Sequence, residues 1–179
     1  MSKSKRITQK KNKTRAAVFV AALVVLIAVS AAMALGLFSG GPGNEEFEPA
    51  RVVRVVDGDT LIVNSNGAEE RLRLIGVDAP ESVHPDESRN TEEGVAASNF
   101  VKSIVKPGQI VYLQKDTTDR DQYDRLLRYV WLEVPDDPWN IDEVRTKMLN
   151  GILVANGHAK PKRYEPDTAY NDIFEAIAS

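Results

Sequence analysis

Three short segments in the middle of the chain have the hydrophobic pattern of strands. The first is dense in β-branched residues, which favours a buried strand. In the third, leucines alternate with arginines, and the preceding Asn66-Gly67 pair is typical of a tight hairpin turn. The pattern predicts a three-stranded meander over residues 51–56, 60–64 and 69–76.

Helical spacing of apolar residues begins after a polar loop. Asn90 with Glu93 three residues later fits a capping box and predicts a helix that runs to about Val105. Its buried stripe is expected to contain Val95, Ala96, Phe100, Ile104 and Val105.

The rest of the chain predicts two more strands and two more helices. The strands are expected over residues 109–115 and 126–133, and the first helix over 148–156. Asp167 is the expected cap of a last helix, in which Tyr170, Ile173, Phe174 and Ile177 fall at helical spacing. Five strands with about three packed helices indicate an α+β, mainly β fold: a small, partly open five-stranded barrel of the OB type.

A long apolar run precedes this predicted domain. Residues 16–38 are apolar apart from Ser30 and Gly36, which is long enough for a transmembrane helix of roughly 20 residues. Residues 1–15 carry seven basic side chains and no acidic one, so they are expected to stay cytoplasmic. We interpret residues 1–15 as a basic cytoplasmic head, 16–38 as a transmembrane anchor or uncleaved signal, 39–50 as a linker, and 51–179 as the folded domain.

The alternative interpretation of the run is a cleaved signal peptide. Ala32-Met33-Ala34 has the small-x-small pattern of a cleavage site, although the run exceeds the 7–15 apolar residues typical of a signal. A buried core helix fits less well, because it would normally show a polar face. Both leading interpretations place the domain outside the cytoplasm. It is then either anchored in the cell membrane by one span or secreted.

The charge is distributed unevenly. The net charge is −3, but beyond the basic head there are 16 Lys and Arg against 26 Asp and Glu, about −10. Domains that bind nucleic acid are usually basic, so any electropositive surface here has to be local. The chain has no cysteine, so its fold depends on its core without disulfides.

Candidate chemistry gathers in two short stretches. Asp59 and Asp78 follow strands that are neighbours in the meander, so their carboxylates could converge on one hard cation with oxygen ligands. Arg73 points away from the leucines on either side of it, and Glu81 follows a proline. Taken singly, each has an ordinary explanation as a turn residue or a solvated charge.

Together with residues further along the chain, these stretches resemble the staphylococcal nuclease (thermonuclease) family. The order and spacing agree over roughly residues 52–159. The shared residues are Asp57–Thr60; Arg73, Asp78, Pro80 and Glu81; Asp121, Tyr123 and Arg125; Met148–Asn150; and Gly157 and Ala159.

The resemblance implies an OB-type barrel that hydrolyses phosphodiester bonds of DNA and RNA with Ca²⁺ and low sequence specificity. It implies Asp59 and Asp78 as metal ligands, and Arg73 and Arg125 as the groups that hold the phosphate. Glu81 is implied to act on the attacking water, usually as general base. Tyr123 and Tyr164 match aromatic residues that line the nucleotide pocket, and stacking on such rings is tolerant of sequence. The expected partners are DNA and RNA, single strands being favoured, and the membrane through residues 16–38. The expected state is a monomer.

Three positions depart from the family pattern. Ala79 replaces a threonine whose backbone carbonyl also binds calcium, Asp124 replaces a glycine beside Arg125, and Gly151 replaces a common helix acid. The alternative functions are a non-catalytic nuclease-like module and an exported protein that binds a protein or wall partner. The acidic balance favours the second of these. The complete set of acids and arginines favours the enzyme.

Overall fold

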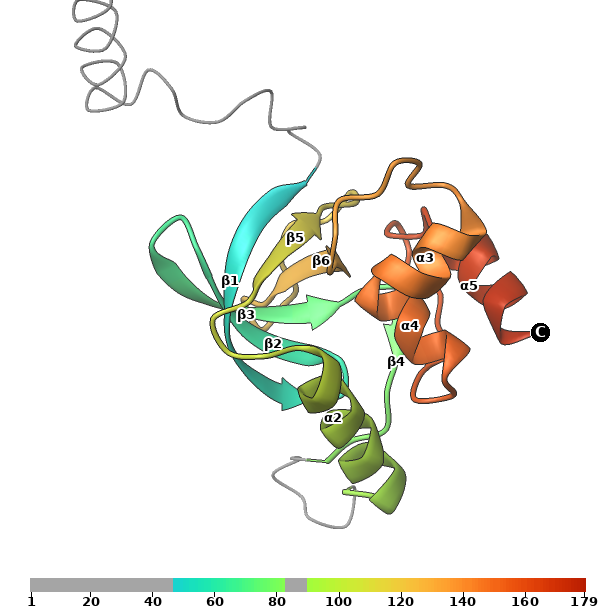
Figure 1. The fold of residues 1–179 in the computed structure, drawn as a ribbon, viewed down its shortest axis with the longest axis horizontal. Helices are drawn as coiled ribbons and strands as arrows, with labels where there is room; N and C mark the ends of the chain where they lie inside the picture. The colour runs from blue at the N-terminus through green and yellow to red at the C-terminus, as the bar shows by residue number, and fades with distance from the viewer. Residues whose placement is uncertain (1–46, 83–89) are drawn as a thin grey trace, which may run out of the picture. The chain divides into compact units, whose positions relative to one another are not determined.

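The computed structural model describes residues 47–82 and 90–179. Its described strands form a closed barrel in the order β1-β2-β3-β6-β5 (Figure 1). All neighbouring strands are antiparallel except β3 and β6. Their bounds are β1 (Glu48–Asp57), β2 (Thr60–Ser65), β3 (Ala68–Leu74), β5 (Ile110–Gln114) and β6 (Leu126–Trp131).

The predicted meander is confirmed, and β1 begins earlier than expected. Asn66 and Gly67 both have positive φ, as a two-residue hairpin turn between right-twisted strands requires. Residues 48–51 pair with β5, and Phe47 packs its ring edge against Trp131 at 6.0 Å between centroids. The barrel is therefore closed instead of partly open, and the last residues of the expected linker belong to the domain.

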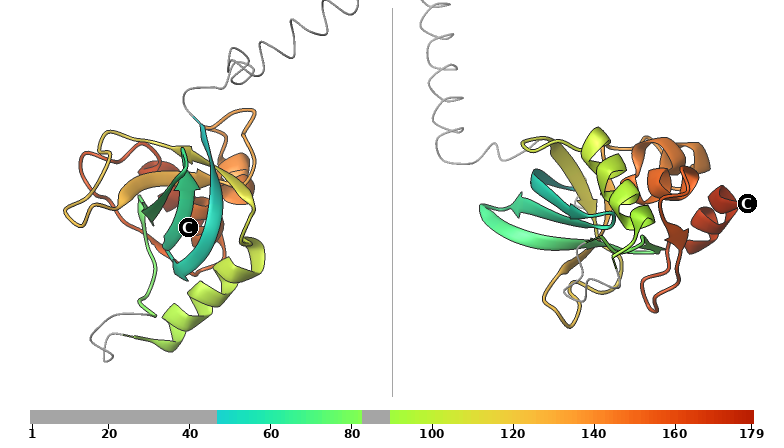
Figure 2. Two further views of the ribbon diagram at one scale, coloured as in Figure 1. Left: turned by 90° about the vertical axis from the view of Figure 1, so that its left-hand side faces the viewer. Right: turned by 90° about the horizontal axis from the view of Figure 1, so that it is seen from below.

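Four helices are described, one more than the sequence predicts. They are α2 (Glu92–Ile104), α3 (Ile141–Lys147), α4 (Leu149–Ala155) and α5 (Asn171–Ala178). A short antiparallel pair joins β4 (Val77–Asp78) to β7 (Lys160–Pro161). Figure 2 shows that α2 lies against the barrel, while α3, α4 and α5 gather on one side of it.

The predicted cap of α2 is wrong, and its predicted buried face is confirmed only in part. Val105 is buried, and Phe100 and Ile104 pack partly against the core, as predicted. Thr91, not Asn90, caps the helix, and its hydroxyl accepts a hydrogen bond from the Gly94 N–H at 3.0 Å. Val95, predicted to be buried, is 49% exposed, and Ala96 is exposed as well.

Small residues on α2 explain why Val95 and Ala96 face solvent instead of the core. Its buried residues are Gly94, Ala97, Ser98 and Val101. A Cβ atom on Gly94 would lie 2.1 Å from the Glu81 carbonyl oxygen, so the backbone of α2 approaches residue 81 as only glycine allows. The close backbone contact at Gly94 therefore leaves Val95 facing solvent.

The sequence also missed α3 and misassigned the cap of α5. Asn140 begins α3 and accepts hydrogen bonds from the Asp142 and Glu143 N–H groups. Asp167 does not cap α5; it is buried and accepts a hydrogen bond from the Thr118 N–H at 2.7 Å. A long-range partner therefore takes the carboxylate that was expected to serve its own helix.

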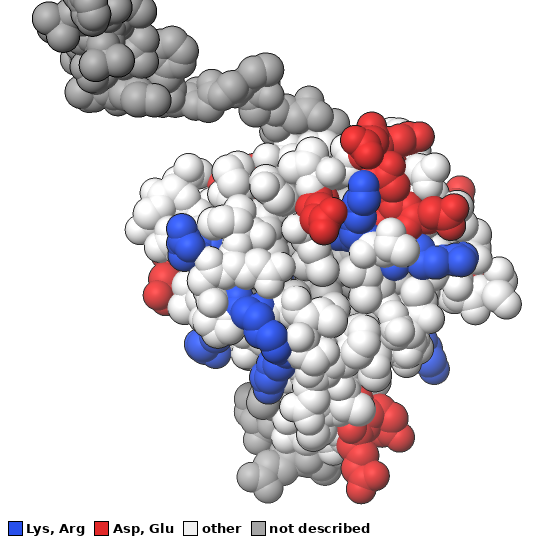
Figure 3. Space-filling view, in the orientation of Figure 1, with Lys and Arg blue, Asp and Glu red and all other residues white. Residues whose placement is uncertain are grey.

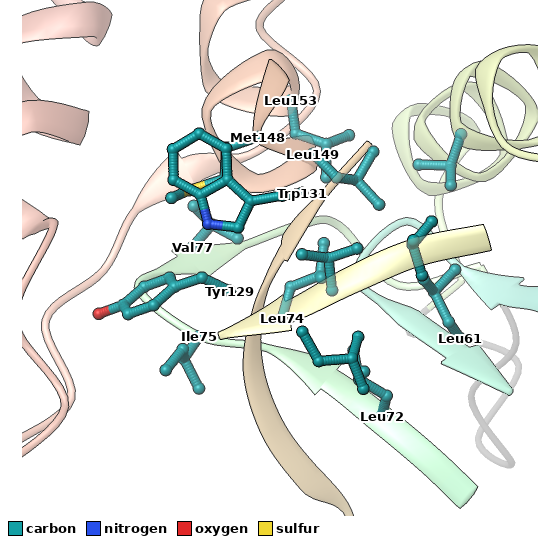
Figure 4. Close-up of a cluster of buried hydrophobic side chains, with 14 of the residues drawn as sticks. Leu61, Leu72, Leu74, Ile75, Val77, Tyr129, Trp131, Met148, Leu149 and Leu153 are labelled. Carbon is teal, nitrogen blue, oxygen red and sulfur yellow. The ribbon is translucent and has the colours of Figure 1, made fainter. Parts of the chain in front are cut away.

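The core extends from the barrel to the helices. Leu61, Leu72 and Leu74 project from the strands, and Leu149 and Leu153 project from α4 (Figure 4). The predicted stripe of α5 is confirmed: Tyr170 and Phe174 are fully buried, and Ile173 and Ile177 pack partly against the core. Burial of this apolar surface is the main favourable contribution to folding.

Asn150 links the barrel to α4 by two buried hydrogen bonds. Its side-chain N–H donates to the Ile75 carbonyl at 2.8 Å, and its side-chain oxygen accepts from the Val130 N–H at 3.0 Å. Ile75 directly follows β3, so Asn150 fixes the path of the chain between β3 and β4.

No helix among residues 47–82 and 90–179 is long and apolar enough to cross a membrane. The anchor expected over residues 16–38 and the basic head lie outside this described part, and both stay predictions.

Asn150→Ala is expected to lower the free energy of unfolding by about 2–4 kcal/mol, because it leaves two buried backbone groups without partners. Denaturant unfolding measures this change. The matched control is Asn156→Ala, which removes an exposed asparagine whose side chain bonds within its own helix. Equal losses in the two variants would contradict the linking role of Asn150.

Candidate active site

The turn between β1 and β2 carries the first acidic residue of the site. A Cβ atom on Gly58 would lie 2.9 Å from the Ala79 Cβ and 3.0 Å from the Ala97 Cβ. Glycine at this position lets the segment after β4 and helix α2 close over the turn. The closure buries Asp59, which is 3% exposed.

The guanidinium of Arg73 lies between two carboxylates. Its Nη1 donates to Asp59 Oδ1 at 2.6 Å, and its Nη2 donates to Asp78 Oδ1 at 3.0 Å. Arg73 comes from β3 between two buried leucines, so alternation along the strand directs it out of the barrel interior. Both acids and the arginine that the sequence placed together are therefore in direct contact.

Burial dominates the protonation of Asp59. It raises the pKa of this carboxyl from 3.8 to about 6, although Arg73 and the Ala79 N–H, which donates at 3.0 Å, lower that pKa. The site thus disfavours a negative charge at Asp59 that is not fully balanced. A second nearby cation would relieve this cost.

Asp57 holds the chain that carries Glu81, a role that the sequence did not reveal. It is 5% exposed, and it accepts hydrogen bonds from the Ser82 hydroxyl at 2.6 Å and the Ser82 N–H at 3.2 Å. The Glu81 carbonyl accepts from the Thr91 N–H at the start of α2. Its carboxylate makes no hydrogen bond or ion pair with the described residues. The backbone of Glu81 is therefore fixed, while its side chain is without a partner among residues 47–82 and 90–179.

Arg125 is held by a neighbouring acid. Asp121 accepts from Arg125 Nε at 2.7 Å and pairs with its Nη2 at 2.6 Å. Burial alone would raise the pKa of the Asp121 carboxyl, but hydrogen bonds from Arg125 and from backbone N–H groups hold that pKa below its usual range. The guanidinium also lies 5.5 Å from the centre of the Tyr123 ring, which is itself 71% exposed.

The three departures from the family pattern have distinct structural settings. Asp124 has a φ of 61°, the left-handed conformation that favours glycine, and its carboxylate lies 3.5 Å from Arg120. The Ala79 N–H donates to Asp59, as described above. A Cβ atom on Gly151 would lie 2.1 Å from the Val144 carbonyl oxygen, so glycine permits the close packing of α3 on α4.

Two residues from the segment after β7 contact Asp78. The Lys162 ammonium donates to Asp78 Oδ2 at 3.0 Å, and the Tyr164 hydroxyl lies 3.4 Å from Asp78 Oδ1. Bonds to Tyr164 and Asp78 keep the pKa of Lys162 above its usual value. The resemblance to the family pointed to Tyr164 but not to Lys162, whose contact with Asp78 joins residues 84 positions apart in the chain.

A pocket of about 710 Å³ brings most of the expected residues together. Asp59 is not part of its wall, because it lies buried behind Arg73. Residues predicted from the sequence that line this pocket are Arg73, Asp78, Glu81, Tyr123, Arg125 and Tyr164. Guanidinium groups, a carboxylate to which no described residue is paired, and exposed aromatic rings around one opening suit recognition of an anionic, ring-bearing ligand.

Comparison with known proteins agrees with this geometry. Residues 71–178 match the family model described as staphylococcal nuclease homologue. The chain belongs to the staphylococcal nuclease family. Within this family it is a nuclease, an enzyme that hydrolyses phosphodiester bonds, so the catalytic reading of the sequence is confirmed over the non-catalytic alternatives.

Relatives of this nuclease include two staphylococcal proteins and one from Bacillus. The chain is 34% identical over 163 residues to a thermonuclease of Staphylococcus hyicus, covering 90% of this chain and 88% of the relative. It is 42% identical over 124 residues to a thermonuclease of Staphylococcus intermedius, covering 69% and 66%. It is 35% identical over 123 residues to endonuclease YncB of Bacillus subtilis (strain 168), covering 68% and 52%.

Because the pKa of Asp59 is raised, removing the charge of this side chain should stabilise the folded protein, and the size of this effect should depend on pH. Because the folded-state pKa of about 6 exceeds the ordinary 3.8, stabilisation from protonation is fully present below pH 3.8 and is lost as the pH rises through 6. Asp59→Asn mimics the protonated acid. In metal-free buffer at pH 8 we expect it to raise the free energy of unfolding by about 1–3 kcal/mol, and the gain should vanish near pH 4.

Denaturant unfolding across this pH range measures the effect. Asp78→Asn is the matched control. The Asp78 side chain is 41% exposed, so removing its charge relieves less burial and should raise the free energy of unfolding less. Parallel pH profiles for the parent and Asp59→Asn would contradict the prediction.

Proposed function

We propose that this nuclease is a calcium-dependent endonuclease that cleaves DNA and RNA with low sequence specificity. The observation that supports it most is the contact of Arg73 with both Asp59 and Asp78 beside the pocket that Glu81 and Arg125 line. This arrangement combines hard oxygen donors, phosphate-binding guanidiniums and a free carboxylate.

The residues present fit a calcium ion. Asp59 and Asp78 supply carboxylate oxygens that already share one cationic partner. The resemblance to the family adds the backbone carbonyl of Ala79 as a further oxygen donor. The described residues include no group of three or more acids or histidines that could enclose a metal. Water and substrate oxygens would have to complete the coordination, as is common for Ca²⁺. When bound, the ion would neutralise the scissile phosphate and help to generate a nucleophilic water.

The two arginines are assigned to the phosphate. Guanidinium groups donate in a fixed fork that matches phosphate oxygens, and they stabilise charge that develops as phosphorus becomes five-coordinate. Asp121 orients Arg125 through Nε and Nη2, which leaves Nη1 for substrate. Arg73 approaches the same pocket from β3.

Glu81 is assigned to the attacking water as general base. A base must lie within hydrogen-bond reach of the proton that it removes, and the Glu81 carboxylate faces the pocket without a partner among the described residues. Asp57 contributes indirectly, because its hydrogen bonds with Ser82 hold the backbone beside Glu81 in place.

The aromatic rings favour a single-stranded substrate. Tyr123 and Tyr164 are 71% and 39% exposed, and both line the pocket. Stacking needs an unpaired base, and it discriminates weakly among bases, which accounts for low specificity. Nothing in this contact requires a second copy of the chain, and we propose that the enzyme acts as a monomer.

We also propose that the nuclease domain acts outside the cytoplasm. The basic head and the apolar run over residues 16–38 support a single-span anchor in the cell membrane. Sequencing the N-terminus of the mature protein tests this: a start near Leu35 would identify a cleaved signal and a secreted enzyme instead.

Calcium removal is expected to abolish cleavage. Full-length protein is incubated with single-stranded DNA in calcium or in EDTA, between neutral and alkaline pH, and products are separated on a gel. We expect cleavage only with calcium. Equal cleavage in EDTA would refute the metal requirement, and no cleavage at any pH with calcium would refute the proposed function.

Glu81→Gln is expected to lower kcat by about 10²–10⁴-fold, the usual contribution of a general base. The matched control is Glu165→Gln, which makes the same change of charge in the same pocket. Arg125→Ala should also lower kcat by orders of magnitude. Loss of activity in the control equal to that in Glu81→Gln would point to pocket charge instead of proton transfer.

A further inference from the structure

The register of the first three strands places two arginines in one row. Arg54 of β1 is paired with Ile62 of β2, and Ile62 is paired with Arg71 of β3. Residues paired directly across neighbouring strands project from the same face of the sheet. Leu61 and Val63, on either side of Ile62, are buried in the core, so this row lies on the outside of the barrel.

Arg71 connects the row to the active site. It lines the same pocket as Arg73 and precedes it by two residues in β3. The two arginines therefore share a face of the strand at a separation of about 6.8 Å along it. From the pocket, the row continues across β2 to β1.

Both arginines of the row are exposed, and no described residue is bonded to either side chain. Neither Arg54 nor Arg71 makes a hydrogen bond or an ion pair with the described residues. By contrast, Arg73 and Arg125 are paired with acids, and the nearby Glu70 is occupied by Arg120.

Acidic side chains form two groups on the face seen in Figure 3. Figure 3 shows acidic side chains gathered around the start of α3 and at the start of α2, in agreement with the acids in the first turns of both helices. In a domain whose charge is acidic overall, two unpaired arginines beside the pocket are a local site for a polyanion.

We propose that Arg54, Ile62 and Arg71, the arginine row, bind the sugar–phosphate backbone of the substrate strand beyond the phosphate that is cleaved. Arg71 binds the phosphate next to the scissile one, and Arg54 binds a phosphate further along the same strand. Ile62, which is half-buried between them, provides an apolar contact for a sugar or base. This inference rests on the proposed function, because the strand is the substrate of the same pocket.

If the arginine row binds the substrate, the affinity of the enzyme should depend on the length of the nucleic-acid strand. A dinucleotide has one phosphodiester, which occupies only the part of the pocket at Arg73 and Arg125, whereas a longer strand also reaches Arg71 at the pocket edge and Arg54 beyond it. Guanidinium contacts to phosphates release counterions, so they make binding dependent on salt.

The test compares the full-length parent with the Arg54→Gln/Arg71→Gln variant. Binding of a fluorescent single-stranded oligonucleotide of about twelve nucleotides is measured in EDTA over a range of salt, and a gel checks that the strand stays intact. Each lost phosphate contact should reduce the slope of log affinity against log salt by about 0.7, so the double variant should lose about 1.4. With calcium, KM for the oligonucleotide should rise about tenfold, while kcat and the cleavage of a dinucleotide should stay unchanged.

The matched control removes two charges elsewhere. Lys102→Gln/Arg145→Gln changes exposed residues of α2 and α3 that do not line the pocket, and its salt slope should equal that of the parent. Arg54→Lys/Arg71→Lys keeps both charges and should keep most of the slope. Binding by the basic head is common to all variants and cancels in the comparison.

An unchanged salt slope in the double glutamine variant, or an equal loss of slope in the control, would contradict the proposal that the arginine row binds the substrate strand. So would a fall of dinucleotide cleavage in parallel with oligonucleotide cleavage, because it would place both arginines in the reaction itself. If the parent cleaves neither substrate, the proposed function fails while the binding measurement in EDTA still decides the row.

Discussion

The ion pair of Arg73 with Asp59 and Asp78 is the interaction on which the site depends. It joins the turn after β1, strand β3 and strand β4 through one guanidinium. Asp59 is nearly inaccessible to water, and a buried carboxylate is costly unless a cation and hydrogen bonds compensate it. The same contact draws both carboxylates to one edge of the pocket. The stability of this edge and its chemistry are therefore coupled.

The scaffold around this ion pair works by close approach as much as by hydrophobic burial. Gly58 and Gly94 let α2 press against the turn that carries Asp59 and against the backbone of Glu81. Asn150 fixes the path of the chain between Arg73 and Asp78 from the opposite side. Small residues and one buried amide thus position groups that would otherwise lie on flexible loops.

The charge of the domain is consistent with this design. An acidic protein can act on a polyanion when its arginines are concentrated at one opening and several of the acids there are engaged by them. Asp121 and Asp78 are engaged by Arg125 and Arg73, whereas Arg54 and Arg71 stay uncommitted. Arg73 and Arg125, which are paired with acids, are held in position in the pocket. Arg54 and Arg71, which have no acidic partner among the described residues, attract the polyanion.

The sequence by itself determined the meander, the Asn66-Gly67 turn and the set of acids and arginines, because each depends on local pattern or on residue identity. It misplaced Val95 and Ala96 of α2, where close backbone contact at Gly94 turns the start of the helix so that both face solvent. It also missed the contact of Asp57 with Ser82 and that of Lys162 with Asp78, which join residues 25 and 84 positions apart. Only the tertiary structure decided these contacts, since the burial and charge that a side chain meets depend on segments that are distant in the chain.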